Sequence, residues 1–157
     1  MTTILENARR VQRGEAPPPP IGRLLGFVLK EIEPGRAVFV MEADERHHNP
    51  MGTLHGGVYC DLADAAMGYA YAATLAEGET FTTVELKVNF LRPVRRGRLT
   101  AEARVVKAGQ RFGLCRVRCQ GRRWQIGGQG RKHLHETAVG PPAHDVAPGP
   151  LCRRKPR

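Results

Sequence analysis

The chain has 157 residues, of which 25 are Lys or Arg and 15 are Asp or Glu, so its formal net charge is +10. This length suits one domain with a single core. No apolar run follows the N-terminal charges, and the longest low-charge stretch, 54–76, contains two aspartates. We therefore expect neither a signal peptide nor a membrane span, and we predict a cytoplasmic protein.

The positive charge is unevenly distributed. Residues 1–102 hold 12 Lys/Arg and 13 Asp/Glu, whereas residues 103–157 hold 13 Lys/Arg and two acidic residues. The last third has poor aromatic interleaving, with one Trp, and no motif that reads RNA or DNA. A solvated basic surface is therefore expected, and no nucleic-acid partner.

The cysteines form no CxxC pair, which argues against a zinc ribbon or a disulfide framework. They are Cys60, Cys115, Cys119 and Cys152. A metal site built from two of these cysteines with His133 and His135 stays a minor alternative, because metal-ligand spacing is absent. We expect free thiols, no metal and no cofactor.

In chain order, 3–13 has the pattern of a short helix, and Gly14 with the prolines at 17–20 predicts a stiff linker. Runs at 24–33 and 36–43 are typical of strands, and the Pro34-Gly35 pair between them predicts a hairpin. A polar loop at 46–52 follows, in which His47 and His48 are expected to be exposed.

Residues 56–76 are small, apolar or aromatic and contain no proline, which predicts one long helix. A helical wheel gives one apolar face. Its members are Val58, Leu62, Ala65, Ala66, Tyr69 and Ala73. Cys60, Asp64, Met67 and Tyr71 fall on the other side, which is not a solvent face either. Such a helix is buried on both sides, which we expect a sheet and a partner subunit to provide.

Strand patterns follow at 81–91, 99–107 and 112–119, with a weaker one at 124–134 that glycines interrupt. The order of hairpin, helix and antiparallel strands predicts an α+β fold. We divide the chain into an N-terminal helix and Pro-rich linker at 1–20, a domain at 21–136, and a basic, Pro-rich disordered tail at 137–157.

Three motifs carry a resemblance to a known family. They are Asn49 followed by 52–57 (GTLHGG), Leu62-Ala63-Asp64 with the aspartate nine positions after His55, and 82–93 (TTVELKVNFLRP). In combination they resemble the hotdog-fold acyl-CoA thioesterases, in the branch that contains the phenylacetic-acid-pathway (PaaI-like) enzymes. The similarity covers about residues 21–119.

The resemblance implies a hotdog fold, in which a curved antiparallel sheet wraps one central helix. It also implies homodimers joined edge to edge, often paired into homotetramers, with the thioester site between subunits. The acidic residue at the position of Asp64 is the family's catalytic carboxylate, acting as general base or as nucleophile. Thr83 stands at the family's hydroxyl position.

Thioester hydrolysis needs an activated water or nucleophile and donors aimed at the carbonyl oxygen. The N–H groups at a helix N-terminus supply such donors, and Gly56 and Gly57 would let a substrate approach closely. We choose the Gly57 N–H as oxyanion donor. Asn49 would bond the carboxylate or the water, Thr83 would hold that water, and His55 would orient the loop or assist the carbonyl.

Each of these assignments has a structural alternative. Gly56 and Gly57 could form a plain turn, His55 could bond loop backbone, and Asn49, which precedes a proline, could form a turn. Thr83 could be an ordinary strand residue.

A second set of residues is expected to bind the substrate. Arg92 and Arg95 would meet the phosphates of coenzyme A, although solvated turn arginines are the default. Asp61 is a secondary site residue, with a structural role as its alternative, and Met67 would shape the acyl pocket. His133 would approach the nucleotide.

The glycine-rich, basic segment 120–134 departs from the family's apolar final strand. An atypical terminus and a shifted reading frame both produce this pattern. The expected function is hydrolysis of an acyl- or aryl-CoA, phenylacetyl-CoA-like or medium-chain. The alternative is a hotdog protein that binds acyl-CoA or a small aromatic ligand without turnover.

Overall fold

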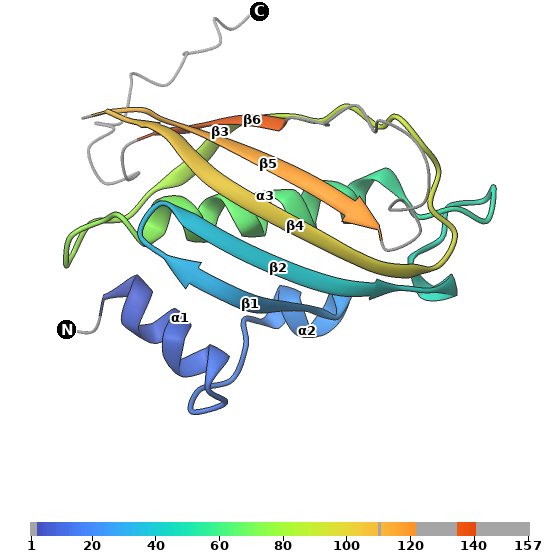
Figure 1. Cartoon of the computed structure of the whole chain (residues 1–157), viewed down its shortest axis with the longest axis horizontal. Coiled ribbons are helices and arrows are strands. Elements are labelled where there is room, and N and C mark those ends of the chain that lie inside the picture. The colour runs from blue at the N-terminus through green and yellow to red at the C-terminus, as the bar shows by residue number, and fades with distance from the viewer. Residues whose placement is uncertain (1–2, 110, 122–134, 141–157) are drawn as a thin grey trace, which may run out of the picture.

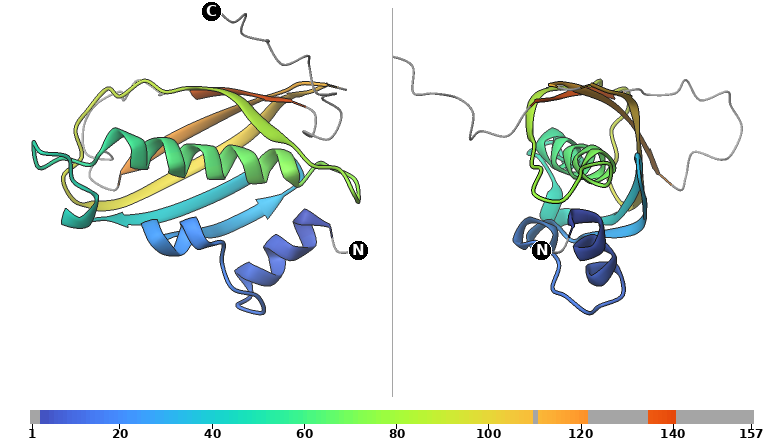
Figure 2. Two further views of the ribbon diagram at one scale, coloured as in Figure 1. Left: turned by 180° about the vertical axis from the view of Figure 1, so that it is seen from behind. Right: turned by 90° about the vertical axis from the view of Figure 1, so that its left-hand side faces the viewer.

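The computed structural model describes residues 3–109 and 111–121, together with the backbone of a strand at 135–140. These residues form a six-stranded antiparallel sheet wrapped around one long helix, with two short helices beside the first strand (Figures 1 and 2). The strand order is β1-β2-β4-β5-β6-β3. The predicted α+β architecture is confirmed.

The N-terminal helix α1 covers Ile4–Gln12 and begins at a capping box, in which Thr3 and Glu6 bond each other's backbone N–H. A second helix, α2 (Pro20–Leu25), was missed by the sequence analysis. Pro20 does not continue the linker but occupies the first helical position, where its missing N–H costs nothing. Gly26, with φ of 75°, then ends the helix.

The first strand therefore begins later than predicted. Strand β1 is Phe27–Glu33, because Leu24 and Leu25 belong to α2. Strand β2 is Arg36–Ala43, as predicted, and Gly35 turns the hairpin with φ of 80°. The pairing runs from Phe27 with Met41 to Glu33 with Arg36.

The other strands come from the second half of the chain. They are β3 (Thr82–Lys87), β4 (Gly97–Ala108), β5 (Gly113–Gly121) and β6 (His135–Gly140). Strand β6 pairs with β3 on one side and β5 on the other, so it closes the sheet over the helix. Residues 137–140, which the sequence analysis placed in a disordered tail, are thus part of the sheet. The predicted strand at 124–134 and the tail at 141–157 lie outside the described residues.

Helix α3 (Gly56–Ala72) runs along the concave face of the sheet (Figure 2). The most buried face of α3 differs from the apolar face that the helical wheel predicted. Fully buried residues include Ala63, Met67 and Ala70, whereas Ala65 and Tyr69 of the predicted face are half-buried. Close packing between α3 and β5 also requires a glycine: a Cβ at Gly113 would lie 2.1 Å from the Tyr71 ring. Strand β5 therefore crosses this ring only with glycine at that position.

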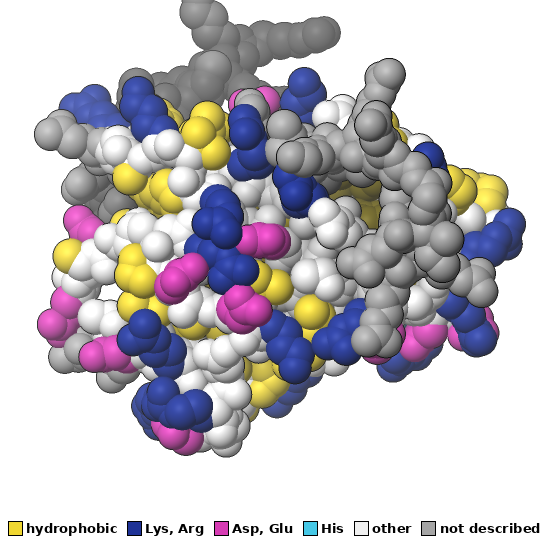
Figure 3. Space-filling view, viewed as in Figure 1, with side chains coloured by type: hydrophobic (Ala, Val, Ile, Leu, Met, Phe, Trp, Pro, Cys, Tyr) yellow, Lys and Arg dark blue, Asp and Glu magenta, His cyan; other side chains and the backbone are white. Residues whose placement is uncertain are grey.

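The outer face of the sheet carries charges of both signs (Figure 3). Arg36 on β2 contacts Glu102 on β4 at 2.8 Å and Glu31 on β1 at 2.7 Å, and these carboxylates raise the pKa of its guanidinium. Among the described helices, none is long and apolar enough to cross a membrane.

Candidate functional site

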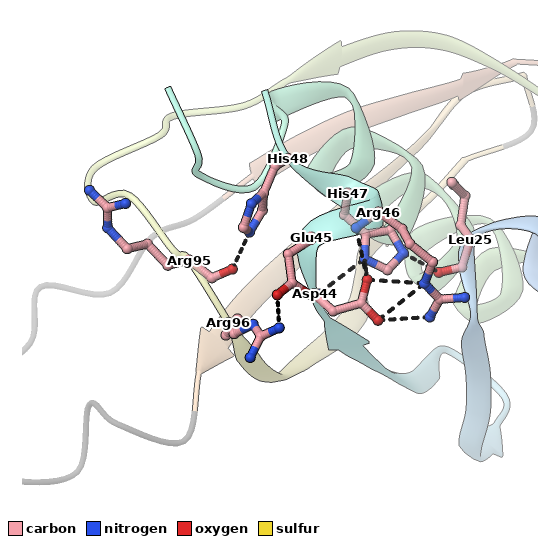
Figure 4. A network of polar contacts seen from close by, with 8 residues as sticks. All are labelled: Leu25, Asp44, Glu45, Arg46, His47, His48, Arg95 and Arg96. Carbon is pink, nitrogen blue, oxygen red and sulfur yellow. Dashed lines mark hydrogen bonds and ion pairs between the residues drawn. The ribbon is translucent and has the colours of Figure 1, made fainter. Parts of the chain in front are cut away.

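A hydrogen-bonded loop delivers the chain from β2 to α3 (Figure 4). Asp44 caps the short 3-10 helix η1 (Glu45–His47) and accepts from the Arg46 guanidinium at 2.8 Å. The Arg46 hydrogen bond lowers the pKa of Asp44 to about 2. His47 is 6% exposed, which corrects the expectation of a free loop histidine.

His47 and His48 each tie this loop to another segment (Figure 4). The His47 Nδ1 accepts from the Asp44 N–H at 3.2 Å, so its Nε2–H donates to the Leu25 carbonyl at 3.1 Å. His48 Nε2 lies 2.6 Å from the Arg95 carbonyl oxygen. The loop is therefore held between α2 and the segment that precedes β4.

Asn49 forms the turn that was weighed as its structural alternative. Its Oδ1 accepts from the N–H groups of Met51 at 3.0 Å and Thr53 at 3.2 Å, and its Nδ2 donates to Thr53 Oγ1 at 2.9 Å. Both functional groups of the side chain are used inside the turn. Asn49 thus fixes the loop ahead of α3, and its bonds do not extend to Asp64 of the same chain.

His55 is the N-cap of α3. Its Nδ1 accepts the Gly57 N–H at 2.9 Å, so the group that the sequence analysis chose as oxyanion donor has a partner in this structure. His55 is exposed. The Phe90 ring packs on Gly56, where an added Cβ would lie 3.2 Å from Phe90 Cζ. Gly56 thus permits a close approach, here by an aromatic ring.

Asp64 lies two turns further along α3, and it has a direct partner on the sheet. Thr83 Oγ1 on β3 donates a hydrogen bond of 2.8 Å to Asp64 Oδ1. Both side chains are half-buried. The structure therefore brings together two of the residues predicted to act on the water, and the threonine contacts the carboxylate itself.

A cavity of about 350 Å³ opens beside Asp64. Asp61 and Asp64 line it, together with apolar residues of α1, α2, β1 and α3 and with Phe81. Burial, and to a lesser degree these two carboxylates, raises the pKa of the neighbouring Cys60 thiol. No residue of the N-terminal helix was predicted to belong to the site. The apolar face of this helix is the sequence signal that could have indicated its contribution.

The remaining predicted residues lie elsewhere. Met67 is fully buried in the core and is not among the residues that line this cavity. Arg92 and Arg95 are exposed on the segment whose Val94 carbonyl accepts from the Leu54 N–H, close to the start of α3. His133 lies outside the described residues.

The described part of the chain holds no cluster of His, Cys, Asp and Glu that could bind a metal ion. Burial raises the pKa of Cys115 to about 11 and that of Cys119 to about 12, so both thiols stay protonated at neutral pH. They are free cysteines, as is Cys60. Their chemistry fits packing rather than reaction.

Distance along the helix separates the two ends of the predicted site. Gly57 and Asp64 are seven residues apart on α3, which corresponds to about 10 Å along the helix axis. One reacting carbon lies about 3 Å from both its nucleophile and its oxyanion donors. The Gly57 N–H and the Asp64 carboxylate of one chain therefore cannot meet at the same carbonyl.

The chain is similar to known thioesterases in sequence and in fold. The thioesterase superfamily matches residues 51–120, which run from the loop through α3 to β5. A Pseudomonas aeruginosa protein assigned as an esterase is 35% identical over 118 residues, covering 73% of this chain and 88% of the relative. The 1,4-dihydroxy-2-naphthoyl-CoA hydrolase of Listeria monocytogenes is 33% identical over 86 residues, 55% of this chain and 70% of that enzyme.

Among solved structures, a thioesterase-class protein of Ralstonia eutropha related to phenylacetic acid degradation superposes with a TM-score of 0.69. It is 27% identical, and the match covers 84% of this chain and 96% of that one. The sheet, the central helix and this likeness define a hotdog fold. The chain belongs to the thioesterase superfamily, and the resemblance read from its motifs is confirmed. The part of the chain that matches two further relatives spans 56% of the length of one from Haemophilus influenzae and 61% of the length of one from Saccharolobus solfataricus.

Proposed function

We propose that the protein is an acyl-CoA thioesterase, which hydrolyses an acyl- or aryl-CoA to the free acid and coenzyme A. The observation that carries this proposal is the Asp64 carboxylate, which is held by Thr83 and faces an apolar cavity. A half-buried carboxylate beside an apolar cavity is a typical place for acid–base or nucleophilic chemistry.

Asp64 serves one of two routes. As general base, its free oxygen takes a proton from water while the water oxygen bonds the thioester carbon, and the C–S bond then breaks to release the CoA thiolate, which is protonated. As nucleophile, the same oxygen bonds the carbon and expels the thiolate, and water cleaves the resulting anhydride. The Thr83 hydrogen bond fixes Oδ1 and leaves Oδ2 for either route.

The oxyanion donor in this proposal is the Gly57 N–H of a partner subunit. It lies at the positive end of the α3 dipole, where negative charge on the carbonyl oxygen is stabilised. The spacing of about 10 Å along the helix within one chain supports a site that two subunits share. Turning of the exposed His55 ring releases the N–H when the thioester binds, and the ring then assists or orients the substrate.

Arg92 and Arg95 would meet the phosphates of coenzyme A in this arrangement. Both arginines lie on the segment before β4, which is hydrogen-bonded to the loop close to the start of α3. The coenzyme A end of the substrate, opposite the acyl group, would therefore lie near them. We infer a homodimer, or two dimers paired, in the cytoplasm, with no metal or redox cofactor. The acyl group is phenylacetyl-like or of medium chain length.

Release of free thiol from acyl-CoA by the purified protein tests the proposal. Asp64→Asn should lower kcat by about 100-fold or more, because it removes the base or nucleophile at nearly constant volume. Glu77→Gln, at an exposed carboxylate beyond α3, is the matched control and should retain full activity. Full activity in Asp64→Asn would refute the role of Asp64.

One observation favours a second candidate, a hotdog protein that binds acyl-CoA or a small aromatic ligand without turnover. The Gly57 N–H donates to His55 Nδ1 in this structure, and a site whose oxyanion donor stays occupied would bind but not react. Tight binding of acyl-CoA without thiol release, at every pH from 6 to 9, would favour this candidate.

A further inference from the structure

The cavity beside Asp64 has a wall that the family match does not include. That match begins at residue 51, whereas Val11 on α1, Ile21 on α2 and Leu29 on β1 all line the cavity. The N-terminal segment therefore forms a part of the site that lies outside the matched family model.

The segment is fixed in place rather than loosely attached. Ala8 on α1 is 2% exposed and belongs to the hydrophobic core, and Gln12 Nε2 donates to the Lys30 carbonyl on β1. The capping box at Thr3 and Glu6 stabilises the start of the helix. The wall therefore has a defined shape in the free protein.

The opposite wall of the cavity follows α3 from a polar to an apolar end. Asp61 and Asp64 come first, and Gly68 and Ala72 follow one and two turns later on the same side. From Asp64 to Ala72 the helix rises about 12 Å. A group whose carbonyl lies at Asp64 would extend along this wall, under α1.

We propose that this cavity holds the acyl group of the thioester and that α1 sets the size of the acyl group accepted. The inference rests on the proposed thioesterase function and adds the substrate class. An apolar cavity of about 150 Å³ is enough for a benzene ring, and this one measures about 350 Å³. The cavity therefore has room for acyl groups larger than one phenyl ring, up to a fused bicyclic aromatic or a medium-length alkyl chain.

The acyl group is also uncharged. Among the described residues that line the cavity, those with charge are Asp61 and Asp64, and both are acidic. A second carboxylate on the acyl chain would be repelled by them and would lose its hydration in the apolar part. Dicarboxylic acyl groups are thus excluded.

Substitutions on α1 test this inference. Val11→Trp fills the cavity from the α1 side, and Ile4→Trp does so nearer the start of the helix, where the change disturbs folding less. Arg10→Trp, at an exposed position of α1, is the matched control. With 2-naphthoyl-CoA and acetyl-CoA as substrates, the ratio of the two kcat/KM values should fall about tenfold or more in the filled variants. It should be unchanged in the control.

A binding measurement separates this inference from the proposed function. Naphthalene-2-acetamide is an uncharged analogue of the acyl group. Calorimetry should show that it binds the native protein and Arg10→Trp equally well. It should bind Val11→Trp and Ile4→Trp at least tenfold more weakly. Such a result without thiol release from any acyl-CoA would support the cavity assignment and refute the thioesterase. Equal binding by all variants, or no binding by the native protein, would overturn the cavity assignment even where thiol is released.

Discussion

Thr83 Oγ1 donates a 2.8 Å hydrogen bond to Asp64 Oδ1, which joins strand β3 to the central helix at the candidate site. The bond holds one carboxylate oxygen and orients the other. Thr83→Ala should lower kcat/KM by about 10- to 100-fold, the range for a hydrogen bond to a charged group. Thr83→Ser retains the hydroxyl and should keep most of the activity. Equal activity in the alanine and serine variants would show that this bond has no catalytic role.

The Gly57 N–H can be removed without removing the residue. Gly57→Pro lacks the N–H, and proline is tolerated in the first turn of a helix. We expect a loss of about 100-fold or more in kcat, as for the loss of one oxyanion donor. Gly57→Ala keeps the N–H, and its Cβ would meet the movable His55 ring at 3.0 Å.

The two Gly57 variants are compared after circular dichroism has shown that each is folded. Gly57→Ala should retain activity within about tenfold of the native protein. If Gly57→Pro folds and is as active as Gly57→Ala, the oxyanion donor is another group.

Asn49 should affect stability and substrate binding together. Asn49→Ala removes the acceptor for the Met51 and Thr53 N–H groups, so urea unfolding should show a loss of about 1–3 kcal/mol in the free energy of unfolding. The loosened loop should raise KM more than it lowers kcat. Unchanged stability with a large fall in kcat would instead indicate direct action on the water.

The loop also gives a pH dependence. Asp44 has its pKa lowered from 3.8 to about 2 by Arg46, so the folded state binds this proton less readily than the unfolded state. The resulting stabilisation is complete above about pH 4 and is lost as the pH falls through about 2. In urea titrations, the difference in stability between the native protein and Asp44→Asn should therefore shrink from pH 5 to pH 2. A constant difference would contradict the assigned shift.

Much of the fold was predictable because its periodicity is local. Strand β2 follows from a short apolar run after the Pro34-Gly35 turn, and helix α3 follows from a long proline-free apolar run. The motifs indicated Asp64 and Thr83. Helix α2 was missed because Leu24 and Leu25 continue the apolar pattern of β1, and Gly26 separates them only through its backbone conformation.

The rest depends on contacts that are distant in sequence. The burial of His47 depends on the Leu25 carbonyl, and the cavity depends on Val11 of α1 and Ala65 of α3 lining the same space. A histidine N-cap for α3 was also not foreseen, since Ser, Thr, Asp and Asn are the usual caps. No pattern within one segment encodes these three features.

The central claim is that one active site takes Asp64 from one subunit and the Gly57 N–H from another. Mixing Asp64→Asn and Gly57→Pro protein tests it most directly, after unfolding and refolding them together in equal amounts. Half of the resulting two-fold dimers would be mixed, each with one intact site, so thiol release should recover to about a quarter of the native rate. Each variant refolded alone should stay inactive. Recovery no greater than the sum of the two variants refolded alone would contradict the claim.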